Sequence, residues 1–316
     1  MSVILPHQQR SWIGKAHIVG ASVVPTYFRP GTLHEDDGTV HDLPRGYDPA
    51  KDDSEGDEWV LINSTPASCV QVGLYHYFQD RGPVDLVVSG PNYGRNTTAL
   101  FALSSGTIGG AMEASVCGKR SIALSYAFSS RTHDPVVIAE ASSHSVKLLE
   151  YLYANWGENV DLYSVNVPLE PDVSQWKVVY TDMLDNRWTS GSCFKAVEST
   201  LADQNPGNQE QRLREQGEKS GSEPAVPGSA PPGKKPQIQH MHFQWSPNFT
   251  DVFRSVEESA PGNDGRAIRD KMTRLVFVAL ALFGVYKNLS LTDEISVTPL
   301  KANFMHASNI KGEIKL

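Results

Sequence analysis

A glycine-rich stretch between Ser89 and Ala114 carries polar residues that could bind an anion or a metal ion. It begins where an apolar run, residues 84–90, ends in Gly90. In open α/β sheets, ligands bind beyond the carboxyl ends of the strands, where glycine-rich turns let backbone amides approach an anion. Asn92 stands in such a turn, and its amide oxygen suits a hard cation such as Mg²⁺ or Mn²⁺. A structural turn, capped by the Asn92 side chain, is the alternative interpretation.

The second half of the stretch predicts a helix that begins near Ser105. The first N–H groups of a helix have no partner within it, and the helix dipole favours negative charge there. Ser105, Gly106 and Thr107 would therefore offer free amides and two hydroxyl groups to a phosphate. An ordinary N-cap, with Gly109 and Gly110 allowing close packing, explains the same residues without a ligand. Neither half matches the dinucleotide pattern GxGxxG or the P-loop pattern GxxxxGK(S/T), so spacing alone predicts an anion or metal site.

Two kinds of element alternate along the chain, as in a parallel sheet with crossover helices. Short apolar runs predict strands, and longer segments of helical period predict the helices between them. The run at 84–90 is continuously apolar, which is typical of a central strand buried on both faces. The expected strands are 59–63, 84–90, 121–128, 160–168 and 177–183, and the expected helices are 66–82, 105–117 and 135–156. The chain is therefore expected to be α/β.

The charge balance argues against a surface that binds polyanions. The chain has 28 Lys and Arg against 36 Asp and Glu, a net charge of −8, and no basic cluster interleaved with aromatic residues. Its three cysteines are too few for a disulfide framework. The apolar run at 275–285 is shorter than the roughly 20 residues of a membrane-spanning helix, and the first residues lack a secretory signal. We expect no nucleic-acid polymer and no membrane as partners, and a cytoplasmic location.

The polar stretch and three further blocks resemble the survival protein E (SurE) family of metal-dependent phosphatases and nucleotidases, in its fungal-type form. The family's SGxNxGxN turn and SGTxxAAxE helix correspond to SGPNYGRN at 89–96 and SSGTIGGAME at 104–113. Three further blocks are similar to blocks of the family. The family's strand and serine loop correspond to VILPHQQRSWIGKA at 3–16, and its GTPxDCVxxAL helix start corresponds to NSTPASCVQVGL at 63–74. A late strand of the family corresponds to SVTPL at 296–300. The blocks occur in the family's order.

This resemblance implies a Rossmann-like, mostly parallel sheet with flanking helices and a C-terminal extension. It also implies hydrolysis of a phosphomonoester, of the acid phosphatase or 5'-nucleotidase type. The expected substrate is a small phosphorylated molecule of the nucleoside monophosphate class, and the expected assembly is a homo-oligomer. By motif, Ser11 and Asn92 correspond to ligands of a divalent metal, Mg²⁺ or Mn²⁺, which would polarise the phosphoryl group and activate water. The residues corresponding to the phosphate pocket are Gly94, Asn96, Ser105, Gly106 and Thr107, and no catalytic residue is assigned.

The first departure from the family pattern concerns the metal. The family also needs two adjacent aspartates at the end of a first strand that precedes the serine loop, and only residues 1–4 precede LPHQQRS here. We therefore expect an N-terminally truncated domain without the aspartate pair. The alternative function is a non-catalytic anion- or nucleotide-binding or interaction module that has lost the metal together with these aspartates. Glu35, Asp36 and Asp37 mimic the aspartate pair, but they follow the serine loop and are expected to form a solvated surface run.

We expect a single SurE-like domain over residues 1–316, and two segments within it depart from the family pattern. Residues 199–239 are rich in Gln, Glu, Gly, Pro, Ser and Lys, and this composition buries too little apolar surface to fold by itself. We expect them to form a disordered insertion. Residues 254–295 are an atypical insertion where the family has a short connection. An incomplete or misjoined coding sequence is the hypothesis that accounts for this insertion and for the missing first strand.

Overall fold

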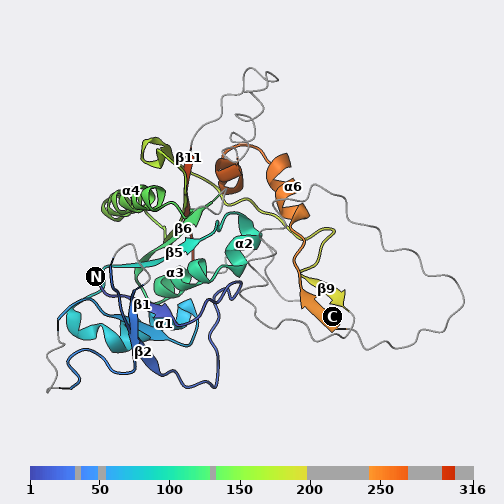
Figure 1. Ribbon diagram of the computed structural model, residues 1–316. Coiled ribbons are helices and arrows are strands. Elements are labelled where there is room, and N and C mark those ends of the chain that lie inside the picture. Colours follow the sequence, from blue (N-terminus) through green and yellow to red (C-terminus); the bar gives the residue numbers. More distant parts are fainter. Residues whose placement is uncertain (33–36, 49–54, 129–132, 198–241, 270–293, 303–316) are drawn as a thin grey trace, which may run out of the picture.

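The computed structural model describes residues 1–32, 37–48, 55–128, 133–197, 242–269 and 294–302 (Figure 1). Its centre is a five-stranded sheet with helices on both faces. In spatial order the strands are β5 (Leu86–Tyr93), β6 (Arg120–Ala127), β7 (Leu162–Pro168), β11 (Glu294–Leu300) and β8 (Lys177–Tyr180). Neighbouring strands are parallel except β7 and β11, which are antiparallel. The expected α/β class, with a mostly parallel and Rossmann-like sheet, is confirmed.

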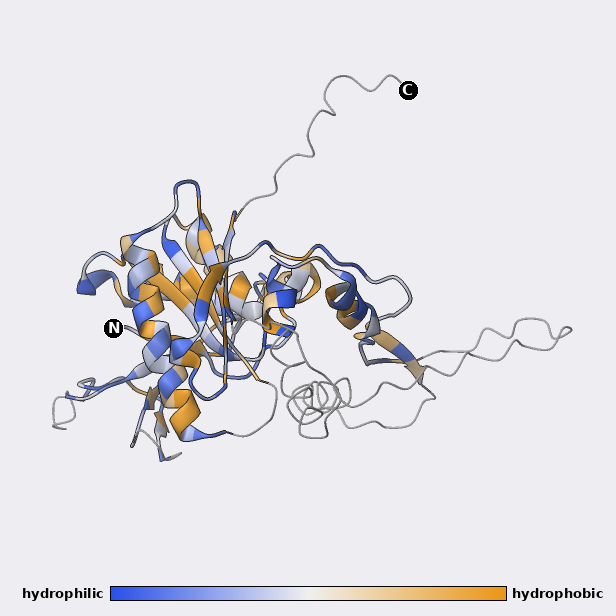
Figure 2. Ribbon diagram, turned by 90° about the horizontal axis from the view of Figure 1, so that it is seen from above, coloured by the Kyte–Doolittle hydropathy of each residue, from blue (hydrophilic) through white to orange (hydrophobic). Residues whose placement is uncertain are grey.

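Alternation along β6 explains how the two faces of this sheet are covered. Ile122 and Leu124 belong to a core that they share with residues of α4 (Pro135–Ala154). Ala123, between them, belongs to a separate core with Ile108 of α3 (Gly106–Val116). Figure 1 shows α4 and α3 on opposite sides of the strands, and Figure 2 shows hydrophobic residues along the strands between them. The sheet is therefore covered on both faces by helices.

The prediction for the strand before the polar stretch is wrong in one respect. β5 is not a central strand, because it lies at the edge of its sheet and pairs only with β6 among the described strands. Val88 is 40% exposed, although the apolar run at 84–90 predicts burial on both faces. A parallel strand is fully buried only where neighbours and helices cover it on all sides. Within the described residues, the second edge of β5 has no such neighbour.

A smaller four-stranded sheet contains the N-terminal residues. Its order is β1 (Ile4–Pro6), β4 (Trp59–Ile62), β2 (Pro25–Arg29) and β3 (Thr39–His41). β1 and β4 are parallel, and the other pairs are antiparallel. Because β1 and β4 are parallel, the loop after β1 and the start of α1 (Pro66–Val72) lie at the same edge of this sheet. α1 also packs on α3, which joins the two sheets through their helices.

The helix after β4 begins and ends where the sequence predicts. Thr65 is the N-cap, its hydroxyl accepting a backbone N–H at 3.1 Å, and Pro66 occupies the first helical position. Between these ends the segment is less regular than predicted. It widens into a π-helical turn, Gly73–Tyr77, and continues as a 3-10 turn, Gln79–Arg81. It stops at Gly82, whose φ of +88° favours glycine.

Further elements are described besides the two sheets and the helices named above. They are α2 (Thr98–Ser104), the 3-10 helix η3 (Val173–Gln175), β9 (Phe194–Val197), β10 (His242–Trp245) and α6 (Thr250–Glu258). Asp251 anchors α6, since its carboxylate accepts the backbone N–H groups of Ser190, Thr189 and Gly191 at 2.7 to 3.1 Å. These hydrogen bonds, led by that of Ser190, hold the pKa of Asp251 well below its usual range. The start of α6 is thereby fixed to the chain that precedes β9.

The two expected insertions fall largely outside the described residues. Residues 199–239 and the apolar run at 275–285 lie wholly outside them. Of residues 254–295, residues 254–269 and 294–295 are described, and the first group includes a helical segment, 264–269, in which Ile268 is buried. This part of the chain therefore packs into the fold. None of the helices in the described ranges combines the length and the hydropathy needed to cross a bilayer.

Candidate functional site

One pocket brings together all seven residues that the sequence singled out for binding, around a cavity of about 180 Å³. They come from the loop after β1 (residues 7–17, the serine loop), from the end of β5 and the turn that follows it, and from the start of α3. These residues are Ser11, Asn92, Gly94, Asn96, Ser105, Gly106 and Thr107. The pocket lies beyond the carboxyl ends of β1 and β5, where α/β folds bind ligands.

The turn at the end of β5 is fixed by backbone and side-chain hydrogen bonds. Gly94 has φ +145°, which favours glycine, and its N–H donates to the Tyr126 carbonyl of β6 at 2.9 Å. The Asn92 amide nitrogen donates to the Gly94 carbonyl, also at 2.9 Å. The turn-capping interpretation of Asn92 is thus confirmed for its nitrogen. The amide oxygen is the atom that a cation would use.

A buried chain of amides holds the next part of the turn. Asn96 is buried, its backbone N–H donates to Asn166 Oδ1 at 2.9 Å, and its side chain donates to Ser125 Oγ at 2.8 Å. Asn166 and Ser125 lie on β7 and β6 and are fully buried. Buried hydrogen-bonded networks of this kind restrict a loop to one arrangement. Asn96 therefore positions the turn, in addition to lining the pocket.

The start of α3 confirms the N-cap interpretation of Ser105. Ser105 is the N-cap, its hydroxyl accepting the Ile108 N–H at 3.1 Å. A Cβ on Gly106 would approach Ile13 of the serine loop to 3.0 Å and Pro66 of α1 to 3.2 Å. Glycine at this position therefore lets three elements converge on the pocket. The first amides of α3 have no acceptor within the helix and belong to residues that line the cavity.

The serine loop lies directly against α3. The Gly14 N–H donates to the Ser104 carbonyl at 2.9 Å. A Cβ on Gly109 would come within 2.4 Å of the Gly14 carbonyl oxygen, so the expected close packing at Gly109 is confirmed. Ser11 is exposed on this loop, and its hydroxyl accepts the Gln9 side-chain amide at 2.8 Å. The loop is thus held at its base, while Ser11 faces the cavity region.

Two arginines that the sequence analysis missed also line the pocket, Arg10 and Arg95. The Arg10 guanidinium donates to Asn63 Oδ1 at 2.6 Å, which ties the serine loop to the end of β4. Arg95 stands between Gly94 and Asn96 in the turn. Both arginines are sequence neighbours of motif residues, and this is the signal that could have indicated them. Two positive charges beside free helix-start amides suit an anion.

The pocket does not by itself fit the divalent metal that the resemblance implies. Mg²⁺ and Mn²⁺ are held in proteins by oxygen ligands, carboxylates foremost. Ser11 and Asn92 supply neutral oxygens, two guanidinium groups line the same cavity, and no Asp or Glu is among its described lining residues. In the ranges that the structure describes, no group of three His, Cys, Asp or Glu side chains could hold a metal ion. The donor set is that of an anion site.

The acidic run after the serine loop does not supply the missing carboxylates within the described residues. Asp37 accepts the backbone N–H and the hydroxyl of Thr32, at 2.7 and 3.1 Å, within its own exposed loop. It does not line the pocket. Glu35 and Asp36 lie outside the described residues. Asp37 thus behaves as the surface residue that the sequence predicts.

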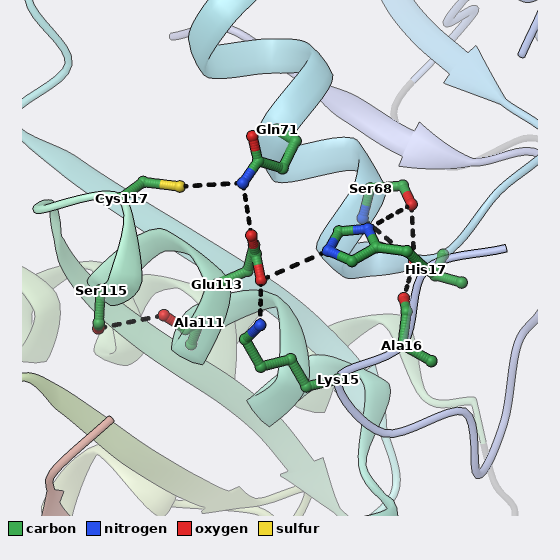
Figure 3. A network of polar contacts seen from close by, with 10 residues as sticks. Lys15, Ala16, His17, Ser68, Gln71, Ala111, Glu113, Ser115 and Cys117 are labelled. Carbon is green, nitrogen blue, oxygen red and sulfur yellow. Dashed lines mark hydrogen bonds and ion pairs between the residues drawn. The ribbon is translucent and has the colours of Figure 1, made fainter. Parts of the chain in front are cut away.

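Glu113 of α3 contacts the serine loop through Lys15 and His17 (Figure 3). Its side chain is buried, and Oε1 accepts the Gln71 side-chain amide of α1 at 2.5 Å. Oε2 pairs with the Lys15 ammonium and lies 3.6 Å from His17 Nε2, both on the serine loop. Burial opposes ionisation, but the bonds from Gln71 and Lys15 prevail and lower the pKa of Glu113. The prediction that Glu113 pairs instead of acting as a base is consistent with this contact, and Glu113 does not line the pocket.

Replacing Glu113 by glutamine should destabilise the fold in a pH-dependent way. At pH 7 we expect Glu113→Gln to lower the free energy of unfolding by roughly 1.5 kcal/mol, the scale of one hydrogen bond to a charged group. Because the folded pKa is lowered, this contribution is complete above the ordinary pKa of about 4.3 and is lost as the pH falls through the lower folded value. The difference from the wild type should therefore narrow only below about pH 4.3.

Urea denaturation at pH 7, 5 and 3.5 measures this difference. Glu158→Gln, which removes an exposed carboxylate, is the matched control and should leave stability unchanged at each pH. A Glu113→Gln deficit that persists unchanged at pH 3.5 would contradict the role given to the ion pair.

Fold and pocket together define an α/β protein with an anion-suited site beyond its strand ends. The solved structure of the SurE protein from Aquifex aeolicus has a similar fold, with a TM-score of 0.51. That similarity covers 96% of this chain and 83% of the other, at 18% sequence identity, and it concerns the fold alone. The family model described as survival protein SurE matches residues 1–190. The chain belongs to the SurE family.

Two curated relatives extend the comparison. The 5'-nucleotidase SurE of Ruegeria pomeroyi is 42% identical over 123 residues, covering 37% of this chain and 46% of that protein. The probable tubulin–tyrosine ligase PBY1 of Saccharomyces cerevisiae is 30% identical over 335 aligned positions, covering 100% of this chain and 38% of that protein. The chain thus spans less than half the length of either relative. The SurE family and its 5'-nucleotidases support a protein of the phosphatase or nucleotidase kind.

Proposed function

We propose that this chain binds and hydrolyses small phosphomonoesters of the nucleoside monophosphate class. The observation that carries the proposal is the convergence of the α3 start, the β5 turn and two arginines on one cavity. Two relatives named 5'-nucleotidase SurE match 37% and 48% of the chain, at 42% and 34% identity. A homo-oligomer remains the prediction from the resemblance, and a cytoplasmic location remains the prediction from the sequence.

Different lining residues make different contacts to a bound phosphoryl group. The backbone amides of Gly106 and Thr107 donate to its oxygens, and the Thr107 hydroxyl adds a further donor. Arg10 and Arg95 neutralise its charge. Fixed donors of this kind also stabilise the extra negative charge that develops on the phosphoryl oxygens during transfer, without the reorganisation that water requires.

Metal dependence is the part of the proposal that the described residues do not supply. In the SurE family a divalent metal, Mg²⁺ or Mn²⁺, activates water, and here Ser11 and Asn92 are the corresponding residues. Without carboxylates beside them, the described pocket accounts for the binding of substrate and for charge stabilisation. A non-catalytic anion- or nucleotide-binding module is therefore the second candidate function. It is favoured by one observation, the absence of acidic residues among the described lining residues.

Phosphate release from p-nitrophenyl phosphate separates the two functions. The hydrolase proposal predicts release by the full chain with Mg²⁺ or Mn²⁺, and none after treatment with a chelator. Release that a chelator leaves unchanged would contradict metal dependence. Binding of inorganic phosphate in calorimetry, with no turnover at any added metal, would overturn the hydrolase proposal and establish the binding module.

A further inference from the structure

One wall of the pocket is aromatic. Trp12 comes from the serine loop, Phe101 from α2, and Phe249 and Phe253 from the start of α6 and its first turn. The polar residues of the β5 turn and of the α3 start line the same cavity. Polar groups together with aromatic rings fit a ligand that has a charged end and a planar, apolar end.

Phe249 anchors this aromatic wall. It is only 8% exposed, and its ring centroid lies 5.8 Å from that of Trp12 and 5.3 Å from that of Phe101. Trp12 itself has φ +60°, a left-handed conformation that costs a residue with a side chain on the order of 1–3 kcal/mol. Such conformations persist where surrounding contacts impose them, and they concentrate at ligand sites. The rings of Trp12, Phe101 and Phe249 are thus packed against one another in the wall.

Phe253 connects the aromatic wall to the anion-binding turn. It is only partly buried, and Arg95 Cζ lies 5.4 Å from its ring centroid. Arg95 directly follows Gly94, so the residue that contacts the ring belongs to the turn itself. Phe253 and the turn line the same cavity, so a phosphoester bound at the turn has an aromatic ring within its pocket.

The segment that supplies half of this wall is not part of the family match. The SurE model matches residues 1–190, whereas Phe249 and Phe253 lie far beyond that range. α6 reaches the pocket because Asp251 ties it to Ser190 and its neighbours. The aromatic wall is therefore a feature that residues outside the family match add to the shared phosphate-binding motifs.

We propose that Phe253, supported by Phe249 and Trp12, forms a stacking subsite for the planar group of the phosphomonoester. This inference rests on the proposed function, because it assigns the leaving group of the same substrate. Base-to-aromatic stacking is sequence-tolerant, since every base has a flat π face, and one such contact changes affinity by about tenfold or more. The pocket then selects nucleoside and aryl phosphates over aliphatic ones.

Calorimetric titration of the full chain tests the subsite with three probes: AMP, ribose 5-phosphate and inorganic phosphate. We expect AMP to bind about tenfold more tightly than ribose 5-phosphate, which lacks the base. In Phe253→Leu this preference should disappear, while the affinities for ribose 5-phosphate and phosphate stay within about twofold, since leucine keeps an apolar side chain but has no ring. Phe253→Tyr keeps the ring and should keep the preference.

Phe243→Leu is the matched control, because Phe243 is 59% exposed on β10 and does not line the pocket. It should bind all three probes as the wild type does. Equal affinities of the wild type for AMP and ribose 5-phosphate would overturn the subsite, whatever the fold of the variants, and so would a preference that survives in a folded Phe253→Leu. An AMP preference without any phosphate release would leave the subsite standing and refute only hydrolysis. Binding of none of the probes would refute both the subsite and the anion pocket.

Discussion

Arg10→Met should lower the affinity of the full chain for inorganic phosphate by about thirtyfold. Hydrogen bonds to charged groups contribute on the order of 1.5–3 kcal/mol, and each 1.4 kcal/mol is a factor of about ten in affinity. Methionine retains much of the length of the side chain but has no charge and no N–H donors. The guanidinium lines the cavity and is held by Asn63 at 2.6 Å, so little conformational entropy remains to be lost on binding. Isothermal titration calorimetry measures the change.

Arg187→Met is the control for this experiment. The Arg187 side chain is 80% exposed, pairs with Asp185 and does not line the pocket, so its loss removes one positive charge away from the pocket. It should change phosphate affinity by less than about twofold, because exposed charges are screened by water and salt. Thermal unfolding checks that Arg10→Met is still folded. Unchanged phosphate affinity in a folded Arg10→Met would show that the anion binds elsewhere.

Gly90→Ala should cost about 3–4 kcal/mol of unfolding free energy, because two unfavourable effects add at this position. Gly90 has φ +125°, which strains any residue with a Cβ. An added Cβ would also lie 2.2 Å from the Leu124 carbonyl oxygen of β6, a backbone atom that cannot turn aside. The turn that carries Asn92 would have to shift away from β6. Urea denaturation followed by circular dichroism measures the loss.

Gly118→Ala separates the two effects. Gly118 also has a positive φ, +74°, but in the described part of the chain no atom beyond its two chain neighbours lies within 4 Å of the position that a Cβ would take. This variant should therefore cost only about 1 kcal/mol, the backbone term alone. If Gly90→Ala were no more destabilising than Gly118→Ala, the close contact between the β5 turn and β6 would be wrong.

The local elements of the fold were predictable because their signals are local. Thr65 followed by Pro66 marks a helix start through capping and a preset φ, and both act within a few residues. Ser105 marks the start of α3 in the same way. The alternation of strands and helices predicted the α/β class. The site residues between Asn92 and Thr107 were also predictable, since their glycines, amides and hydroxyl groups lie close together in sequence, whereas Ser11 was indicated by the family resemblance.

The edge position of β5 was not predictable from its own residues. An apolar run indicates how much surface a strand can bury. Which strands lie beside it depends on pairing with segments that are distant in sequence. The roles of the two arginines and of the aromatic wall were not predictable for the same reason. Phe253 lies more than 150 residues from Gly94 in sequence, and only the fold brings its ring beside Arg95. No local pattern links an α6 phenylalanine to a glycine-rich turn.

A crystal structure of the full chain with AMP tests the central claim most directly. We expect the phosphate at the start of α3, within hydrogen-bond distance of the Gly106 and Thr107 amides and of the Arg10 guanidinium. The adenine should lie against the ring of Phe253. A phosphate bound away from the Ser105 to Thr107 helix start would contradict the claim that this pocket is the phosphomonoester site.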